Sequence, residues 1–144
     1  MKKEEAPIVV EQDFDRSASD VWHAITKISE MRKWYFDNIP DFKAEVGFAT
    51  QFVVESGDRS FLHLWKVTEV DPLRKVVYNW KYEGFLGDSF VTFEVSGDEK
   101  SARLRVTTLV KESFPEDVPE FSRESCLGGW TYLIKGRLKA YLNE

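Results

Sequence analysis

The chain has 144 residues, of which 42% are hydrophobic and 31% charged, a balance that suits one globular domain able to bury its own core. The formal net charge of -5 argues against nucleic acid or an anionic membrane surface as the main partner. A single cysteine excludes an internal disulfide. Without an apolar signal-peptide core or a continuous apolar stretch long enough to cross a bilayer, we expect a cytoplasmic protein with no integral membrane association.

The N-terminal part of the chain predicts one strand followed by two short helices. Residues 8–14 alternate between apolar and polar side chains, which is the pattern of a half-buried strand. Ser17 suits a helix cap, with Asp20 in the first turn. We expect a second short helix from Ser29. Its buried face should consist of Met31, Trp34 and Tyr35.

From there to about Ser113, strand patterns follow one another without an intervening helix. The predicted strands are Phe48–Glu55, Phe61–Val70, Lys75–Tyr82, Ser89–Val95 and Ala102–Val110. Short turn sequences such as 56–58 and 96–98 join them, and such turns are typical of hairpins. An antiparallel meander is therefore expected, and a parallel α/β sheet is not.

A long helix is predicted at the C-terminus, from about Phe121 to Leu142. Its apolar stripe is Leu127, Trp130, Ile134, Leu138 and Tyr141, with Leu133 and Leu142 beside it. One helix cannot cover a flat sheet of so many strands, so the sheet must curve around it. Because the side chains of the helix reach only part of the concave face, we expect a cavity between helix and sheet.

Several short segments, in this order along the chain, carry a resemblance to a known family. They are Ser19-Asp20-Val21-Trp22 with Ala24-Ile25, Trp34-Tyr35, Pro40-Asp41-Phe42, Val67 to Pro72, Val76 to Trp80, and Gly128-Gly129-Trp130. The chain resembles the START-like, birch-pollen-allergen-like (SRPBCC) superfamily. Within it, the chain is similar to the branch named after the C-terminal domain of the activator of heat shock protein 90 ATPase. The resemblance implies a single α+β domain over residues 1–144 with the helix-grip fold, in which a curved antiparallel sheet wraps a long C-terminal helix. It also implies an internal hydrophobic cavity.

Alternation along the strands assigns one face of each strand to this cavity. The residues predicted to contact an apolar ligand are Phe52, His63, Trp65, Trp80, Tyr82, Phe93, Thr108, Trp130, Leu133 and Ile134. The alternative interpretation is that these rings simply fill the core. Gly128 and Gly129 also allow two interpretations. They could open a gap for a ligand, or they could let helix and sheet approach closely or mark where the helix begins.

Residues suited to metal binding or catalysis are sparse. His23 and His63 lie far apart in the sequence and have no cysteine at ligand spacing, so no metal site is predicted. Cys126 precedes the glycines near the helix start, where a thiolate could be stabilised, but we favour the interpretation that it is a buried small apolar residue. No nucleophile motif, phosphate loop or catalytic carboxylate pair is visible. We therefore predict no catalytic residue, no cofactor and no enzymatic activity.

These observations support one main hypothesis, the binding of a small hydrophobic molecule such as a lipid or an aromatic metabolite. The alternative is a co-chaperone role with a heat shock protein 90 type ATPase as the partner, which the resemblance alone implies. The namesake of that branch carries a separate N-terminal domain for which 144 residues leave no room, and this counts against the alternative. A third hypothesis, cyclisation or hydration as in other members of the superfamily, would require polar residues around the ligand, and the sequence offers few.

Overall fold

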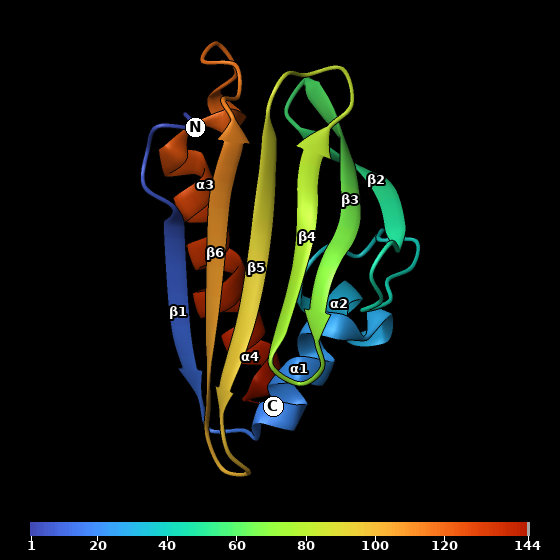
Figure 1. Cartoon of the computed structure of the whole chain (residues 1–144), viewed down its shortest axis with the longest axis vertical. Coiled ribbons are helices and arrows are strands. Elements are labelled where there is room, and N and C mark those ends of the chain that lie inside the picture. The colour runs from blue at the N-terminus through green and yellow to red at the C-terminus, as the bar shows by residue number, and fades with distance from the viewer. Residues whose placement is uncertain (144) are drawn as a thin grey trace.

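The computed structural model describes residues 1–143 as a curved six-stranded antiparallel sheet with helices on its concave face (Figure 1). In chain order the first elements are β1 (Ile8–Phe14), α1 (Ala18–Thr26), α2 (Ile28–Trp34), β2 (Ala49–Ser56), β3 (Arg59–Asp71), β4 (Lys75–Tyr82), β5 (Asp88–Gly97) and β6 (Ala102–Glu112). A short 3-10 turn, η1 (Pro119–Phe121), precedes the long C-terminal helix. That helix consists of α3 (Arg123–Trp130), a π-helical part η2 (Thr131–Leu138) and α4 (Lys139–Leu142). The predicted helix-grip arrangement of the α+β class is confirmed.

The strands are ordered β1-β6-β5-β4-β3-β2 across the sheet. Only β1 lies out of chain sequence, and it pairs with β6 from Ile8 opposite Thr108 to Phe14 opposite Ala102. The face predicted to be apolar is the buried one on each strand, as in β3, where Phe61, His63 and Trp65 are all buried. Hydrophobic alternation thus determined which way every strand faces.

Local capping explains where the helices begin. The hydroxyl of Ser17 accepts a 3.0 Å hydrogen bond from the backbone N–H of Asp20, which confirms the predicted cap of α1. Ser122 caps α3 in the same way, by accepting from the backbone N–H of Ser125 at 3.1 Å. The long helix therefore begins at Arg123, two residues after the predicted start, and Phe121 belongs to the separate turn η1.

The buried face of the C-terminal helix differs from the predicted stripe. Its buried side chains recur every four residues, at Trp130, Ile134, Leu138 and Leu142. This spacing suits the wider turns of η2, and extended backward it reaches Cys126, which is half-buried. Leu127 was wrongly placed in the stripe because a period of 3.6 residues was assumed, and its side chain is largely exposed.

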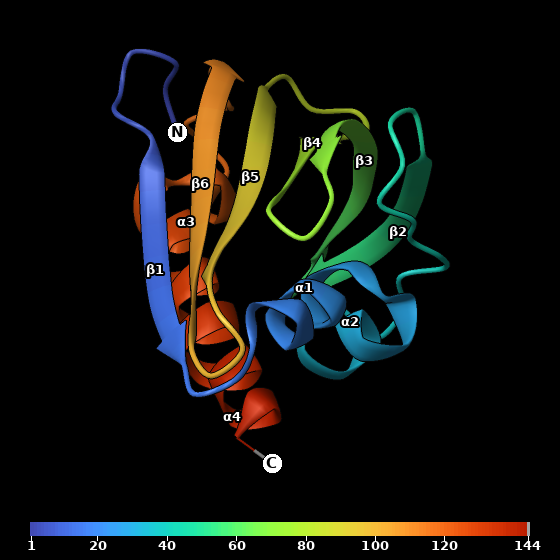
Figure 2. The same ribbon diagram turned by 60° about the horizontal axis from the view of Figure 1, so that its bottom comes forward.

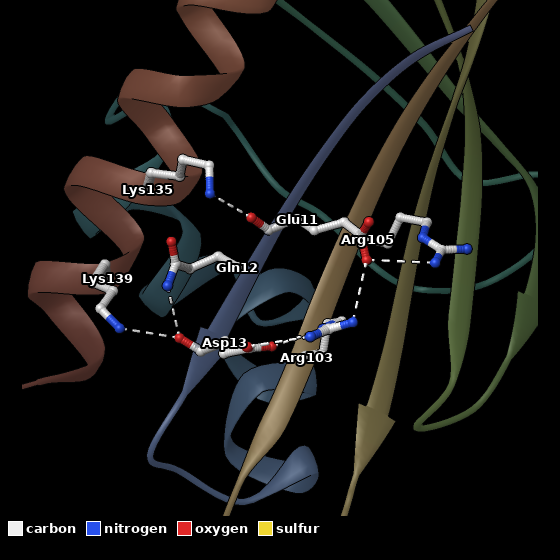
Figure 3. Close-up of polar contacts among 7 residues, drawn as sticks. All are labelled: Glu11, Gln12, Asp13, Arg103, Arg105, Lys135 and Lys139. Carbon is white, nitrogen blue, oxygen red and sulfur yellow. Dashed lines mark hydrogen bonds and ion pairs between the residues drawn. The ribbon is translucent and has the colours of Figure 1, made fainter.

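The helix lies along the β1 edge of the sheet and leaves the β2–β3–β4 side uncovered (Figure 2). Two lysines fix it there. Lys135 Nζ donates to the backbone oxygen of Glu11 at 2.7 Å, and Lys139 Nζ donates to that of Asp13 at 3.1 Å (Figure 3). These carbonyl groups belong to an edge strand, so the lysines also occupy acceptors that another strand could use. On the other side of β1, Arg103 of β6 pairs with the Asp13 carboxylate at 2.7 Å.

The interior is divided into two apolar clusters. The larger one packs α1, α2 and the C-terminal helix against the sheet and includes Trp34, Trp65, Tyr78 and Phe93. The smaller one contains Phe61, Phe114 and Phe121, where the segment after β6 turns into η1. In Figure 1 this segment lies at the end of the sheet opposite α1 and α2. No helix within residues 1–143 is both long enough and apolar enough to span a membrane.

Candidate functional site

A cavity of about 400 Å³ lies between the C-terminal helix and the sheet, where the two clusters meet. Its lining is mostly aromatic and aliphatic and comes from β2 to β6, from the residues after α2 and from the helix. Charged groups of Met1, Glu120 and Arg137 belong to the lining as well. The N-terminal ammonium of Met1 donates to the backbone oxygen of Phe121 at 2.6 Å. Glu120 pairs with Arg59 at 3.3 Å, and Arg137, which is exposed, donates to the backbone oxygen of Lys33 at 2.9 Å.

The position of the helix explains why this space is open. The helix packs along β1, and the two short helices fill only one end of the concave face. Gly129 faces the remaining space without a side chain, and a Cβ atom built there would meet no atom within 4 Å. Gly128 has equally free surroundings. Neither close approach to the sheet nor the start of the helix accounts for the two glycines, because α3 begins five residues before Gly128.

The structure places six of the ten predicted ligand residues in the cavity lining and leaves four outside it. The six are His63, Trp80, Tyr82, Thr108, Trp130 and Leu133. The four are Phe52, Trp65, Phe93 and Ile134.

Those four face the interior as predicted but are covered by other side chains. The ring of Tyr35 lies 5.2 Å from that of Trp65 and 6.3 Å from that of Phe93, centroid to centroid. Phe36 covers Phe52 at 5.2 Å. Ile134 is fully buried within the larger cluster. Their expected contact with a ligand is therefore not supported by the geometry, because α2 and the residues after it fill that part of the concave face.

Several lining residues were not among those predicted. They are Tyr35 and Phe36 after α2, Phe61 on β3, Phe114 and Phe121 of the smaller cluster, and Cys126 and Gly129 on α3. Phe61 shares its strand face with His63, so the alternation could have identified it. The others come from segments outside regular strands, whose position over the sheet depends on tertiary packing that no local pattern encodes.

His63 is the most buried ionisable side chain of the lining that could change charge near neutral pH. Its Nδ1 lies 3.0 Å from the backbone oxygen of Phe61. A carbonyl oxygen only accepts, so the proton of the neutral ring is on Nδ1. Burial lowers the pKa of His63 to about 4, and the bond to Phe61 offsets this only in part. The imidazole is therefore neutral at physiological pH.

Most other polar groups of the lining already have partners within the protein. The indole N–H of Trp130 donates to the Thr108 hydroxyl at 3.1 Å, and the Ser89 hydroxyl donates to the backbone oxygen of Trp80 at 2.7 Å. The indole N–H of Trp80 has no hydrogen-bond partner within residues 1–143. Two effects act on the pKa of the Tyr82 hydroxyl. Burial raises it and is the larger effect, and the nearby indole N–H of Trp80 lowers it.

Cys126 does not behave as an activated thiol. Burial raises its pKa, and Thr108, the N-terminal ammonium and Trp130 offset this only in part. The prediction of a small apolar residue fits this environment better than the prediction of a stabilised thiolate. Within the described part of the chain, no three His, Cys, Asp or Glu side chains are grouped so that they could hold a metal ion.

Comparison with known proteins gives the family. The profile of the family described as activator of Hsp90 ATPase homolog 1-like protein matches residues 15–143, nearly the whole chain. The chain belongs to this family, a branch of the START-like superfamily, as the sequence resemblance predicted. No curated protein matches the chain.

Solved structures share the fold at low sequence identity. Protein CV1439 from Chromobacterium violaceum is 19% identical, with a TM-score of 0.77 over 96% of this chain and 97% of that one. The Aha1 dimer from Colwellia psychrerythraea is 20% identical, with a TM-score of 0.70 and 96% of each chain covered. DynU16, a protein of the dynemicin biosynthetic locus, is 21% identical with a TM-score of 0.74. The match covers 96% of this chain and only 48% of DynU16. At these identities the likeness establishes the fold alone.

Proposed function

We propose that this protein binds a small hydrophobic molecule in the cavity between β3, β4 and the C-terminal helix. The observation that carries the proposal is the space itself, about 400 Å³ lined mainly by rings and aliphatic side chains. This volume lies in the range of small-molecule sites, and an apolar lining with a few polar groups is typical of them. Burial of apolar ligand surface, at roughly 25 cal/mol per Å², would supply most of the affinity.

We propose that the protein binds its ligand without catalysing a reaction on it. A general base that works near neutral pH needs a pKa near neutrality, and burial brings the pKa of His63 down to about 4. The one polar partner of its ring within residues 1–143 is a backbone oxygen, which cannot relay a proton. The high pKa of Cys126 likewise makes it a poor nucleophile. These features support a carrier or a sensor more than an enzyme.

Native mass spectrometry and a thermal-shift screen test the proposal. Purified protein, before and after extraction with organic solvent, should show a loss of bound mass, and neutral aromatic or lipid-like compounds should raise the melting temperature of the extracted protein. A Gly129→Leu variant, which places a side chain in the cavity, should lose both responses, whereas Gly128→Leu, whose residue does not line the cavity, should keep them. No bound mass and no stabilisation by any compound would reject the proposal.

A co-chaperone role is the second candidate, and the family match is the observation that favours it. Such a role would use the outer surface and would not depend on the cavity. Addition of the purified protein to a heat shock protein 90 type ATPase should then accelerate ATP hydrolysis equally for the wild type and for Gly129→Leu. Absence of stimulation at saturating protein would remove this candidate.

A further inference from the structure

The ring of His63 offers the cavity an unused hydrogen-bond acceptor. Only 6% of His63 is exposed, and the residue lines the cavity. Nδ1 carries the proton and bonds to Phe61, so Nε2 has a free lone pair. No residue within 1–143 donates to it. Nε2 is not fully enclosed by the protein, and His63 lines the cavity, so a ligand can reach this atom.

The ring is held in place on several sides. It stacks on Phe52 at 5.0 Å between centroids, and Tyr82 meets it edge-on at 4.8 Å. Phe36 and Trp80 contact it at 5.6 Å and 5.5 Å. The imidazole therefore cannot turn Nε2 away from the cavity without disturbing four other rings and losing the bond to Phe61.

Nε2 opens into an apolar cavity in which no described residue supplies it with a donor, so a ligand that brings a donor gains a hydrogen bond there. A site built to receive a donor discriminates strongly against an analogue that lacks one. The charged groups of the lining already have partners of their own. Glu120 is paired with Arg59, and Arg137 is exposed and bonded to Lys33. The N-terminal ammonium of Met1 donates to the backbone oxygen of Phe121 at 2.6 Å. The side chains packed around the His63 ring are all aromatic.

We propose that the ligand is a neutral, largely apolar molecule carrying a hydroxyl or N–H group that donates to His63 Nε2. A phenol fused to or substituted with apolar groups is the simplest chemical class that fits, since its ring would pack among Phe36, Trp80 and Trp130. This inference rests on the proposed function and adds His63 as the residue that determines specificity.

Four probes of nearly equal size separate the possibilities: naphthol, its methyl ether, naphthalene and naphthoate. Their dissociation constants are measured by titration calorimetry at neutral pH with the wild type and with His63→Phe, which keeps a ring against Phe52 and removes the acceptor. His23→Phe serves as the matched control, because His23 is outside the cavity lining. We expect wild type and control to bind naphthol about tenfold more tightly than the methyl ether, the scale of one hydrogen bond. His63→Phe should bind both equally.

Other binding results for the four probes would contradict either the role of His63, the requirement for a neutral ligand or the proposed function. Equal binding of naphthol, methyl ether and naphthalene by the wild type would refute the role of His63 and leave the apolar cavity standing. Tighter binding of naphthoate than of naphthol would refute the requirement for a neutral ligand. Failure of all four to bind would count against the proposed function as well. Should His63→Phe not fold, nitrogen NMR of histidine-labelled wild type gives the same decision, because naphthol should shift the Nε2 resonance and the methyl ether should not.

Discussion

The indole N–H of Trp130 donates to the Thr108 hydroxyl at 3.1 Å and so joins the C-terminal helix to β6 at the wall of the cavity. Thr108→Val keeps the shape of the side chain but leaves a buried N–H without a partner, so it should lower the free energy of unfolding by about 1–3 kcal/mol. Thr107→Val, the adjacent residue on the opposite face of β6, is the matched control and should change it by less than about 0.5 kcal/mol. Urea unfolding of the three proteins measures both effects, and equal stability would contradict the structural role of this bond.

The two glycines of α3 should respond alike to alanine. Both have space for a Cβ atom, and both lie in a regular helical turn. Gly128→Ala and Gly129→Ala should each raise the free energy of unfolding by about 0.5–1 kcal/mol, because alanine loses less backbone entropy on folding into a helix. Thermal unfolding followed by circular dichroism measures this. Destabilisation by either substitution would mean that the helix approaches another part of the chain closely at that residue.

Stability should fall below neutral pH because of His63. Its pKa is about 4 in the folded protein and 6.5 when unfolded, so the unfolded chain takes up the proton first as the pH falls. The contribution to stability is complete above pH 6.5 and is lost progressively toward pH 4. Between pH 7 and pH 5 the loss should be about 2 kcal/mol. Tyr82, the ionisable ring in contact with His63, has a raised pKa and stays neutral throughout this range.

Carboxylates also titrate in acid, so the effect of His63 is obtained by difference. The pH dependence of unfolding for His63→Phe is subtracted from that of the wild type, and His23→Phe is carried in parallel. The His63 variant should be flatter between pH 7 and pH 5, whereas the His23 variant should follow the wild type. Three identical slopes would show that His63 is not buried as described.

The ion pair between Arg103 and Asp13 should behave as a surface contact. Arg103 holds the pKa of Asp13 below its usual value through a hydrogen bond, so this contribution exists above the unfolded pKa of Asp13 and disappears as the pH falls through the folded one. Arg103→Gln should lower the melting temperature slightly at low salt, and the difference should vanish in about 1 M NaCl. A difference that persists in high salt would indicate that Arg103 contributes packing instead of charge.

The fold could be predicted from the sequence because hydrophobic alternation and helix caps are patterns of neighbouring residues. Alternation of two residues placed Phe61, His63 and Trp65 on one face, and the Ser17 cap fixed the start of α1. The cavity residues were harder to predict, since the alternation shows only which side of the sheet a residue faces. Whether Trp65 meets a ligand or another ring depends on where Tyr35 lies, and that position is set by packing across the fold.

The C-terminal helix illustrates a second limit. A spacing of three residues before Trp130 favours Leu127 for the buried stripe. The buried side chains instead recur every four residues through η2, and Leu127, which lies in α3, is exposed. The same four-residue spacing brings Cys126 and Trp130 onto the inner face. A change of helix type cannot be recognised from hydrophobic spacing alone, because both periods pass through Trp130 and Ile134.

A crystal structure of the protein grown with naphthol tests the occupancy of the cavity most directly. We predict density for one planar molecule between His63 and Trp130, with its hydroxyl oxygen at hydrogen-bonding distance, about 2.7–3.2 Å, from His63 Nε2. A cavity closed by the protein's own rings, or filled by ordered water at saturating naphthol, would contradict this prediction.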